Sequence, residues 1–194
     1  GEKNYVLEKV EFAEGGDGTV TSEAAKNVVN VYYTADEIGT DDPERPDGVP
    51  DKYQATVTYA ATNGTVSISK AVVTLLDAEG NPAEDGYGHL LISQIPTATP
   101  ADGYDGATEV WTKNDGAAKA PNADTRIYGD TAYAVSWQKG DFGYTVNYIF
   151  DGEIDSVTGN GTFQAAIPYD SDETKTRGEK NYVLEKVEFA EGGD

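Results

Sequence analysis

The chain has 194 residues without cysteine or methionine, and its 35 acidic and 14 basic side chains give a formal net charge of −21. This charge disfavours nucleic acid and anionic membrane surfaces as partners, because both attract positively charged proteins. No apolar run approaches the roughly 18 residues of a membrane-spanning helix, so we expect no membrane insertion. Without cysteine, disulfides cannot stabilise a small domain.

The first and last 17 residues are identical, and both read GEKNYVLEKVEFAEGGD. The two copies begin at Gly1 and Gly178, so the sequence predicts a repeat of 177 residues. That length is too great for one unit of a helical solenoid and suits one or two small domains. Since the chain also contains no methionine, we interpret it as a window on a longer repetitive protein.

Alternation of apolar and polar residues predicts half-buried strands at 29–33, 55–59, 133–137 and 144–150. A continuous apolar run at 72–76 predicts a central strand. Helical signals are few: Ser22 is a candidate N-cap of one short helix, and residues 88–95 fit either a short helix or a strand. The sequence therefore predicts a mainly β fold with a small α content.

Asn-Gly and Asp-Gly dipeptides tolerate the positive φ angles of two-residue hairpin turns. We therefore predict such turns at Asn63-Gly64 and Asp151-Gly152, with Asn160-Gly161 as a third candidate. Gly64→Val is expected to be damaging, because a β-branched residue resists positive φ. In the repeated segment, the apolar pairs Tyr5/Leu7 and Val10/Phe12 are out of phase, which predicts a β-bulge or a bend between them.

Two segments rich in Asp, Gly, Pro or Lys have the composition of connectors. They are an acidic linker at residues 35–52 and a hinge at residues 139–143. They leave one domain at residues 53–138 and the first half of another at residues 144–194, in which 178–194 repeats 1–17. Residues 1–34 are then the second half of that other domain, so the domain boundary is rotated relative to the ends of the chain.

In this rotated frame, YTVNYIFDGEIDSVTGNG at 144–161, followed by residues 1–33, resembles the mucin-binding-protein-type repeat of Gram-positive surface proteins. The shared features are the Y-x-V-x-Y strand, the D-G turn and the closing V-x-V-Y-Y. YQATVTYAATNGTVS at 53–67, PTATPADGYDG at 96–106 and GDTAYAVSW at 129–137 are similar to the Listeria–Bacteroides-type repeat, a small β-grasp module.

The resemblance implies two small β-grasp-like or sandwich-like modules per repeat, strung as a rod on a cell surface. It also implies a possible adhesive role, but it assigns no binding residue to this chain. We therefore expect an extracellular structural repeat of a surface stalk or filament, stiffened by calcium at the acidic linker, whose partners are adjacent copies, head to tail. The alternative is an adhesin repeat that binds a host glycan or protein.

The acidic linker contains the strongest candidate site, with Asp36, Asp42, Asp47 and Asp51 as the expected calcium ligands. Calcium takes six to eight oxygen ligands, often from closely spaced carboxylates on a loop turned by glycine. The segment D-G-V-P-D at 47–51 resembles the calcium loops of thrombospondin type-3-like repeats, although it lacks the D-x-D-x-D spacing. The alternative is a solvated acidic linker stiffened by proline.

The sequence offers no catalytic constellation, and we expect no enzyme. His89 is the only histidine, and the chain has neither a cysteine nor a G-x-S-x-G motif that could supply a nucleophile for it. Trp137 ends an alternating strand and is expected in the core, whereas Trp111 fits either a core or a sugar-binding position.

Overall fold

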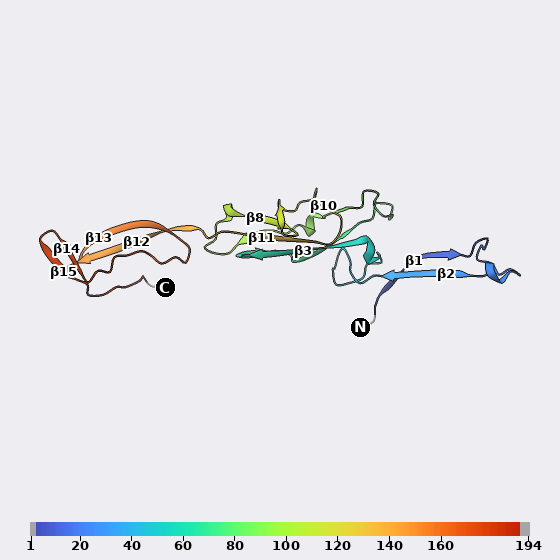
Figure 1. Ribbon diagram of the computed structural model, residues 1–194, viewed down its shortest axis with the longest axis horizontal. Helices are drawn as coiled ribbons and strands as arrows, with labels where there is room; N and C mark the ends of the chain where they lie inside the picture. The colour runs from blue at the N-terminus through green and yellow to red at the C-terminus, as the bar shows by residue number, and fades with distance from the viewer. Residues whose placement is uncertain (1–2, 191–194) are drawn as a thin grey trace. The chain divides into compact units, whose positions relative to one another are not determined.

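The computed structural model describes residues 3–190, which divide into two compact units. Among these residues, unit 1 comprises 3–102 and 106–138, and unit 2 comprises 103–105 and 139–190. The mainly β fold is confirmed (Figure 1). The described residues contain only short 3-10 helices: η1 (Ala24–Lys26), η2 (Asp51–Tyr53), η3 (Ile92–Gln94) and η4 (Gly106–Thr108).

The strands of unit 1 are β1 (Tyr5–Phe12), β2 (Val29–Ala35), β3 (Gln54–Thr62), β4 (Gly64–Val66), β5 (Lys70–Thr74), β6 (Gly88–His89), β7 (Ala98–Pro100), β8 (Val110–Lys113), β9 (Gly116–Ala118), β10 (Arg126–Ile127) and β11 (Thr131–Ser136). Those of unit 2 are β12 (Asp141–Phe150), β13 (Glu153–Thr162), β14 (Thr174–Arg177) and β15 (Lys180–Val183). The four alternating segments predicted as strands lie in β2, β3, β11 and β12, apart from Trp137, which directly follows β11.

The core of unit 1 lies on a five-stranded mixed sheet with the order β5-β3-β11-β8-β9. The central strands β3 and β11 are parallel, and every other neighbouring pair is antiparallel. Residues along β11 alternate between buried and exposed, as its period-two sequence predicts. Both tryptophans are buried against this sheet, which places Trp137 in the core as expected and removes Trp111 from the exposed positions that could bind a sugar.

A polar contact fixes η3 against the sheet from within the core. The Tyr59 hydroxyl donates to the carbonyl of Gln94 at 2.8 Å, and the Gln94 amide nitrogen donates to the carbonyl of Val72 at 2.6 Å. Tyr59 also stacks on Tyr133 with ring centroids 6.0 Å apart. Since the Tyr59 ring is buried, its hydroxyl needs this partner to avoid the cost of an unsatisfied polar group.

We expect Tyr59→Phe to weaken the dependence of stability on alkaline pH. Burial, with a smaller contribution from Tyr133, raises the pKa of the Tyr59 hydroxyl above its ordinary value. The folded state thus favours the protonated form, so its contribution to stability is complete below the unfolded pKa of about 10 and declines as pH rises towards the folded pKa. Urea denaturation at pH 8 and pH 11 measures this. At pH 8 the free energy of unfolding of the variant should be about 1 kcal/mol lower than that of the parent, because the hydrogen bond is lost. Between pH 8 and pH 11, this free energy should fall by less in the variant than in the parent. Equal losses between pH 8 and pH 11 would contradict the assignment.

The prediction of a central strand at residues 72–76 is wrong. The strand is β5, at Lys70–Thr74, and it lies at one edge of the five-stranded sheet. Ala71, Val72 and Val73 are nevertheless buried, and other segments also cover the edge. The Gln94 amide caps the carbonyl of Val72, and the Lys70 ammonium donates to Glu44 of the acidic segment at 2.8 Å.

The prediction of a hairpin turn at Asn63-Gly64 is also wrong. Asn63 has a φ of 64°, but β4 begins at Gly64 and pairs with β7, while β3 pairs with β5. Gly64 is required for space, since a Cβ there would lie 2.3 Å from the Trp137 ring and 2.4 Å from the Thr99 carbonyl oxygen. The substitution at Gly64 is still expected to be damaging, but through a collision and not through positive φ.

Two further local predictions fail. Asn160-Gly161 lies inside β13, paired with Gly143 and Phe142, so it makes no turn. Ser22 caps no helix: η1 begins at Ala24, and the Thr21 hydroxyl accepts the hydrogen bond from the Glu23 N–H at 3.1 Å. Residues 88–95 contain both predicted alternatives in short form, β6 and η3.

The turn at Asp151-Gly152 is confirmed. Asp151 has a φ of 50° and Gly152 a φ of 89°, as a type I′ turn requires, and β12 and β13 pair on either side of it from Phe150/Glu153 to Asp141/Thr162. The segment predicted as a hinge, residues 139–143, straddles the start of β12, which begins at Asp141. The division between the two units falls between Gln138 and Lys139.

Candidate functional site

The acidic segment is a folded loop in which carboxylates accept backbone hydrogen bonds. Asp36 is buried, with 6% of its surface exposed. Its two carboxylate oxygens accept from the N–H groups of Asp47 and Gly48, each at 3.0 Å. Gly48 adopts a φ of 86°, which allows the chain to turn towards Asp36. A single buried carboxylate therefore closes the loop.

Asp47 and Asp51 make further closures of the same kind. Asp47 accepts from the Thr40 N–H, the Val49 N–H and the Gln54 side-chain amide, each at 3.0 Å. Asp51 accepts from the N–H groups of Glu37 and Ile38 at 2.8 and 3.2 Å. Through Gln54, the first residue of β3, the loop is joined directly to the central sheet.

Asp42 does not join this network. One of its oxygens accepts from the Glu44 N–H at 3.1 Å, and the other lies 3.4 Å from the Arg45 guanidinium. Within residues 3–190, no three or more histidine, aspartate or glutamate side chains are grouped so that they could hold one metal ion. Calcium binding by Asp36, Asp42, Asp47 and Asp51 stays a prediction, and the backbone donors explain the density of acids without a metal.

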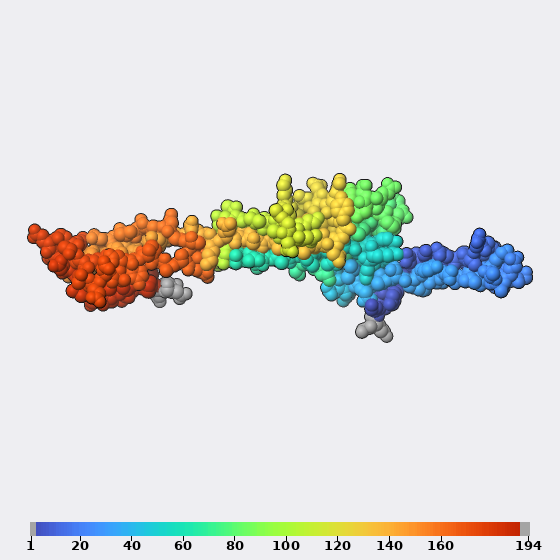
Figure 2. Space-filling view, viewed as in Figure 1, coloured from blue at the N-terminus to red at the C-terminus, as the bar shows by residue number. Residues whose placement is uncertain are grey.

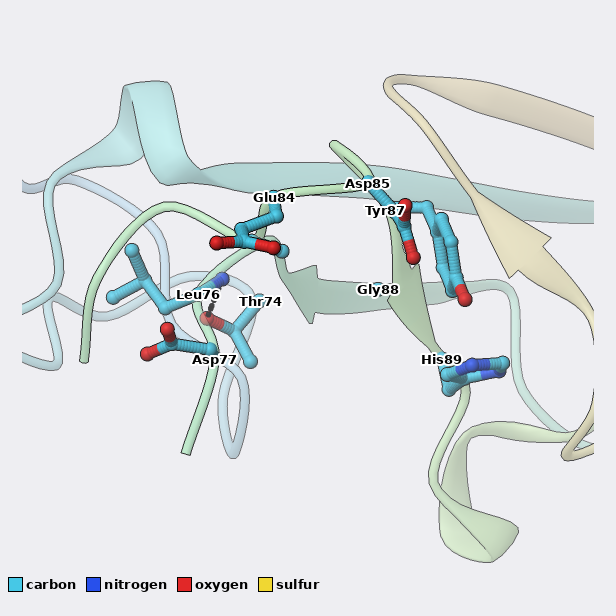
Figure 3. Close-up of a pocket in the computed structure, with 9 residues that line it drawn as sticks. Thr74, Leu76, Asp77, Glu84, Asp85, Tyr87, Gly88 and His89 are labelled. Atoms are coloured by element: carbon cyan, nitrogen blue, oxygen red, sulfur yellow. Dashed lines mark hydrogen bonds between the residues drawn. The ribbon is translucent and has the colours of Figure 1, made fainter. Parts of the chain in front are cut away.

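A pocket lies beside β6 in unit 1 (Figure 3). Its lining residues are Thr74, Leu76, Asp77, Ala83, Glu84, Asp85, Tyr87, Gly88 and His89. The rings of Tyr87 and His89 meet edge to face at 5.2 Å, and Tyr128 packs on Tyr87 at 5.4 Å. The pocket combines carboxylates with aromatic rings, and its lining contains neither serine nor cysteine that could act as a nucleophile beside His89.

An exposed apolar surface lies on one face of the hairpin formed by β1 and β2. The pairing is antiparallel and shifts register between Leu7 and Lys9, which confirms the predicted bulge. The bulge keeps the apolar pairs before and after it on one side, because Tyr5, Leu7, Val10 and Phe12 face Ala35, Tyr33, Val31 and Val29 respectively. We call this side the apolar hairpin face; it consists of Tyr5, Leu7, Val10, Phe12, Val29, Val31 and Tyr33.

Every side chain of the apolar hairpin face is between 46% and 62% exposed. Figure 2 draws this hairpin in blue, as a narrow arm of atoms. Soluble monomers rarely expose a contiguous apolar patch of this kind unless another surface covers it. The apolar hairpin face is thus the candidate interface of the chain, and the alternating pattern of β2 was its signal in the sequence.

Unit 2 presents a second apolar face, on β12. This face, here called the β12 face, consists of Phe142, Tyr144, Val146, Tyr148 and Phe150, which all point to the same side of the strand. The hairpin of β14 and β15 packs over its end. The Tyr182 ring contacts Phe150 at 5.0 Å, the Lys175 ammonium lies 4.1 Å from the Tyr148 ring, and Arg177 pairs with Glu153 at 2.6 Å.

The two copies of the repeated segment have different structures. In the first copy, Tyr5–Phe12 is a continuous strand that pairs with β2. In the second copy, only Lys180–Val183 is a strand, and it pairs with β14. Residues 184–190 correspond to residues 7–13 and contain no strand. Identical sequences thus differ in structure according to which neighbouring segment is present.

A scan against protein-family models, a search of curated proteins and a search of solved structures found no match to this chain. The resemblance to mucin-binding-protein-type and Listeria–Bacteroides-type repeats therefore stays a prediction. Among residues 3–190, the structure contains no helix that is both long and apolar enough to cross a membrane.

Proposed function

We propose that the chain is a structural repeat unit of an extracellular bacterial surface stalk or filament, in which copies follow one another head to tail. The observation that carries this proposal is the identity of residues 1–17 and 178–194. A chain that returns to its own first 17 residues after 177 positions is the pattern of a tandem array. Neighbouring copies of the same unit are then its main partners.

The fold supports a structural role. The central sheet has parallel strands β3 and β11 in the middle, each flanked by an antiparallel strand, which is the order expected of a β-grasp-like module. The acidic loop is tied to this sheet by its own hydrogen bonds, as at Gln54 and Asp47. A unit stiffened in this way, without disulfides, fits a spacer that must hold its shape outside a cell.

An adhesin repeat that binds a host glycan or protein is the second candidate. The observation that favours it is the aromatic cluster of Tyr87, His89 and Tyr128 beside the pocket, where the Arg126 guanidinium lies 4.7 Å from the centre of the Tyr87 ring. Exposed aromatic rings with polar neighbours are suited to stack on sugar rings. Binding of the intact chain to a glycan array, lost in Tyr128→Ala, would favour this function.

The test of the structural proposal is the full-length gene combined with surface labelling. We expect an export signal, several successive copies of the 177-residue unit and a C-terminal cell-wall anchor. An antibody raised against the chain should then label intact, unpermeabilised cells. A gene with a single unit, or labelling only after the cells are opened, would contradict the proposal.

A further inference from the structure

We propose that each junction between repeats is a single domain completed by the following copy. In it the repeated segment is the middle strand of a three-stranded sheet, with β14 at one edge and the β2 of the next copy at the other. This inference rests on the proposed tandem array. The apolar hairpin face of one copy then packs on the β12 face of the preceding copy.

The first argument is that the two copies of the segment use opposite edges. In the second copy, the Leu184 N–H donates to the Glu173 carbonyl at 2.8 Å, so Leu184 bonds towards β14. In the first copy, the Asn4 carbonyl accepts from the Asp36 N–H at 3.1 Å, so Asn4 bonds towards β2.

Asn4 corresponds to Asn181, which is three residues before Leu184 and therefore of opposite parity. Successive residues of a strand direct their backbone groups to opposite edges. One strand can therefore make both sets of hydrogen bonds at once, and neither pairing displaces the other.

The second argument is that the start of the segment, exposed at Tyr5 in the first copy, is half-buried at the equivalent Tyr182 in the second copy. Tyr182 corresponds to Tyr5 of the apolar hairpin face and packs on Phe150 of the β12 face at 5.0 Å. Phe189 corresponds to Phe12 and lies 6.3 Å from Tyr169 of the same unit, although it stays 56% exposed. The second copy thus contacts the β12 face through Tyr182, the equivalent of Tyr5.

The third argument is that the β14 edge is not available to the repeated segment of another copy. The β14 edge is already occupied by β15, which follows it after a two-residue turn with Gly178 at a φ of 64°. Such a short connection gives residues 180–183 a much higher effective concentration than any other copy of the segment. The edge of residues 181–189 opposite β14 is the one proposed to pair next. A β2 strand that follows these residues in the same chain would fill it.

The experiment compares amide hydrogen exchange by NMR in two chains. One is the 194-residue chain, and the other carries a second copy of residues 18–35 after Asp194. In the first copy the Ala13 N–H donates to the Val28 carbonyl at 3.0 Å, so the equivalent Ala190 amide should gain the same bond. We expect exchange at Ala190 to slow by about 100-fold in the extended chain. The Leu184 amide, already bonded to Glu173, is the internal control.

A matched extended chain carries aspartate at the added equivalents of Val31 and Tyr33. We expect fast exchange at Ala190 to return, because charges cannot be buried against the β12 face. Unchanged exchange at Ala190 in the unmodified extended chain would overturn the inference, and so would slow exchange already present in the 194-residue chain. Either result would leave the tandem array itself intact, since the gene tests that separately.

Discussion

Replacing Asp36 with alanine is expected to lower the free energy of unfolding by about 3 kcal/mol. The variant removes the acceptor of two backbone N–H groups, those of Asp47 and Gly48, at the point where the loop is closed. Hydrogen bonds to a charged group contribute about 1.5–3 kcal/mol each, and part of the loss is recovered if water reaches the freed donors. Chemical denaturation followed by the fluorescence of the buried Trp111 and Trp137 measures the loss in the same unit.

Asp41→Ala is the matched control, because Asp41 lies on the same loop and is exposed. Its effect should stay within about 0.5 kcal/mol. Denaturation of the parent and of Asp36→Ala in EDTA and in saturating calcium separates the two explanations of the acidic loop. Backbone capping by Asp36 requires the full loss in EDTA, and equal stability of variant and parent there would contradict it.

Calcium binding to the folded state alone would stabilise the parent by about 2.7 kcal/mol at a hundredfold excess over the dissociation constant. Asp47→Ala should then remove most of this gain. Parent curves that coincide in EDTA and in calcium would rule out a contribution of calcium to folding.

Gly64→Ala is the second variant with a large expected effect, a loss of about 3 kcal/mol. The added methyl group would overlap the Trp137 ring at 2.3 Å and the Thr99 carbonyl oxygen at 2.4 Å. Either the tryptophan leaves its buried position or β4 separates from β7. Both responses disturb the core of unit 1, and thermal unfolding followed by tryptophan fluorescence would report them.

Gly129→Ala is the control for this substitution, because a Cβ at Gly129 meets no atom within 4 Å and Gly129 is not among the residues of positive φ. We expect a change in stability of less than about 0.5 kcal/mol there. A Gly64 variant as stable as the Gly129 variant would show that the close approach of Gly64 to Trp137 is not needed for folding.

The strands could be predicted because their signal is local. In β11 and β12, alternate residues face opposite sides of the strand, so the period of two is visible in the sequence itself. The bulge in β1 was visible for the same reason, as a break in that period. The turn at Asp151-Gly152 joins two strands that pair directly with each other, so its dipeptide was sufficient.

The errors occur where the partner of a segment lies elsewhere in the chain. Asn63-Gly64 has the same turn chemistry as Asp151-Gly152, but the strand that follows Asn63, β4, pairs with β7 and not with β3. The run that forms β5 reads as a central strand, since the sequence does not reveal that Gln94 and the acidic loop cover a sheet edge. Such contacts depend on tertiary packing and not on local propensity.

Only part of the candidate site could be predicted from the sequence. The sequence identified the acidic residues of the loop but not what they bind, because backbone N–H groups leave no signature in side-chain composition. The apolar hairpin face was predictable as a strand pattern in β2, but the exposure of Val29, Val31 and Tyr33 follows only from the fold of residues 3–190.

The central claim is that successive copies share the repeated segment within one domain. A crystal structure of two successive units in one chain tests it most directly, at the internal junction. We expect the shared segment to pair with β14 on one edge and with the following β2 on the other, with Tyr5, Leu7 and Phe12 of that junction buried on the β12 face. An internal hairpin whose apolar face stays as exposed as that of β1 and β2 here would contradict the claim.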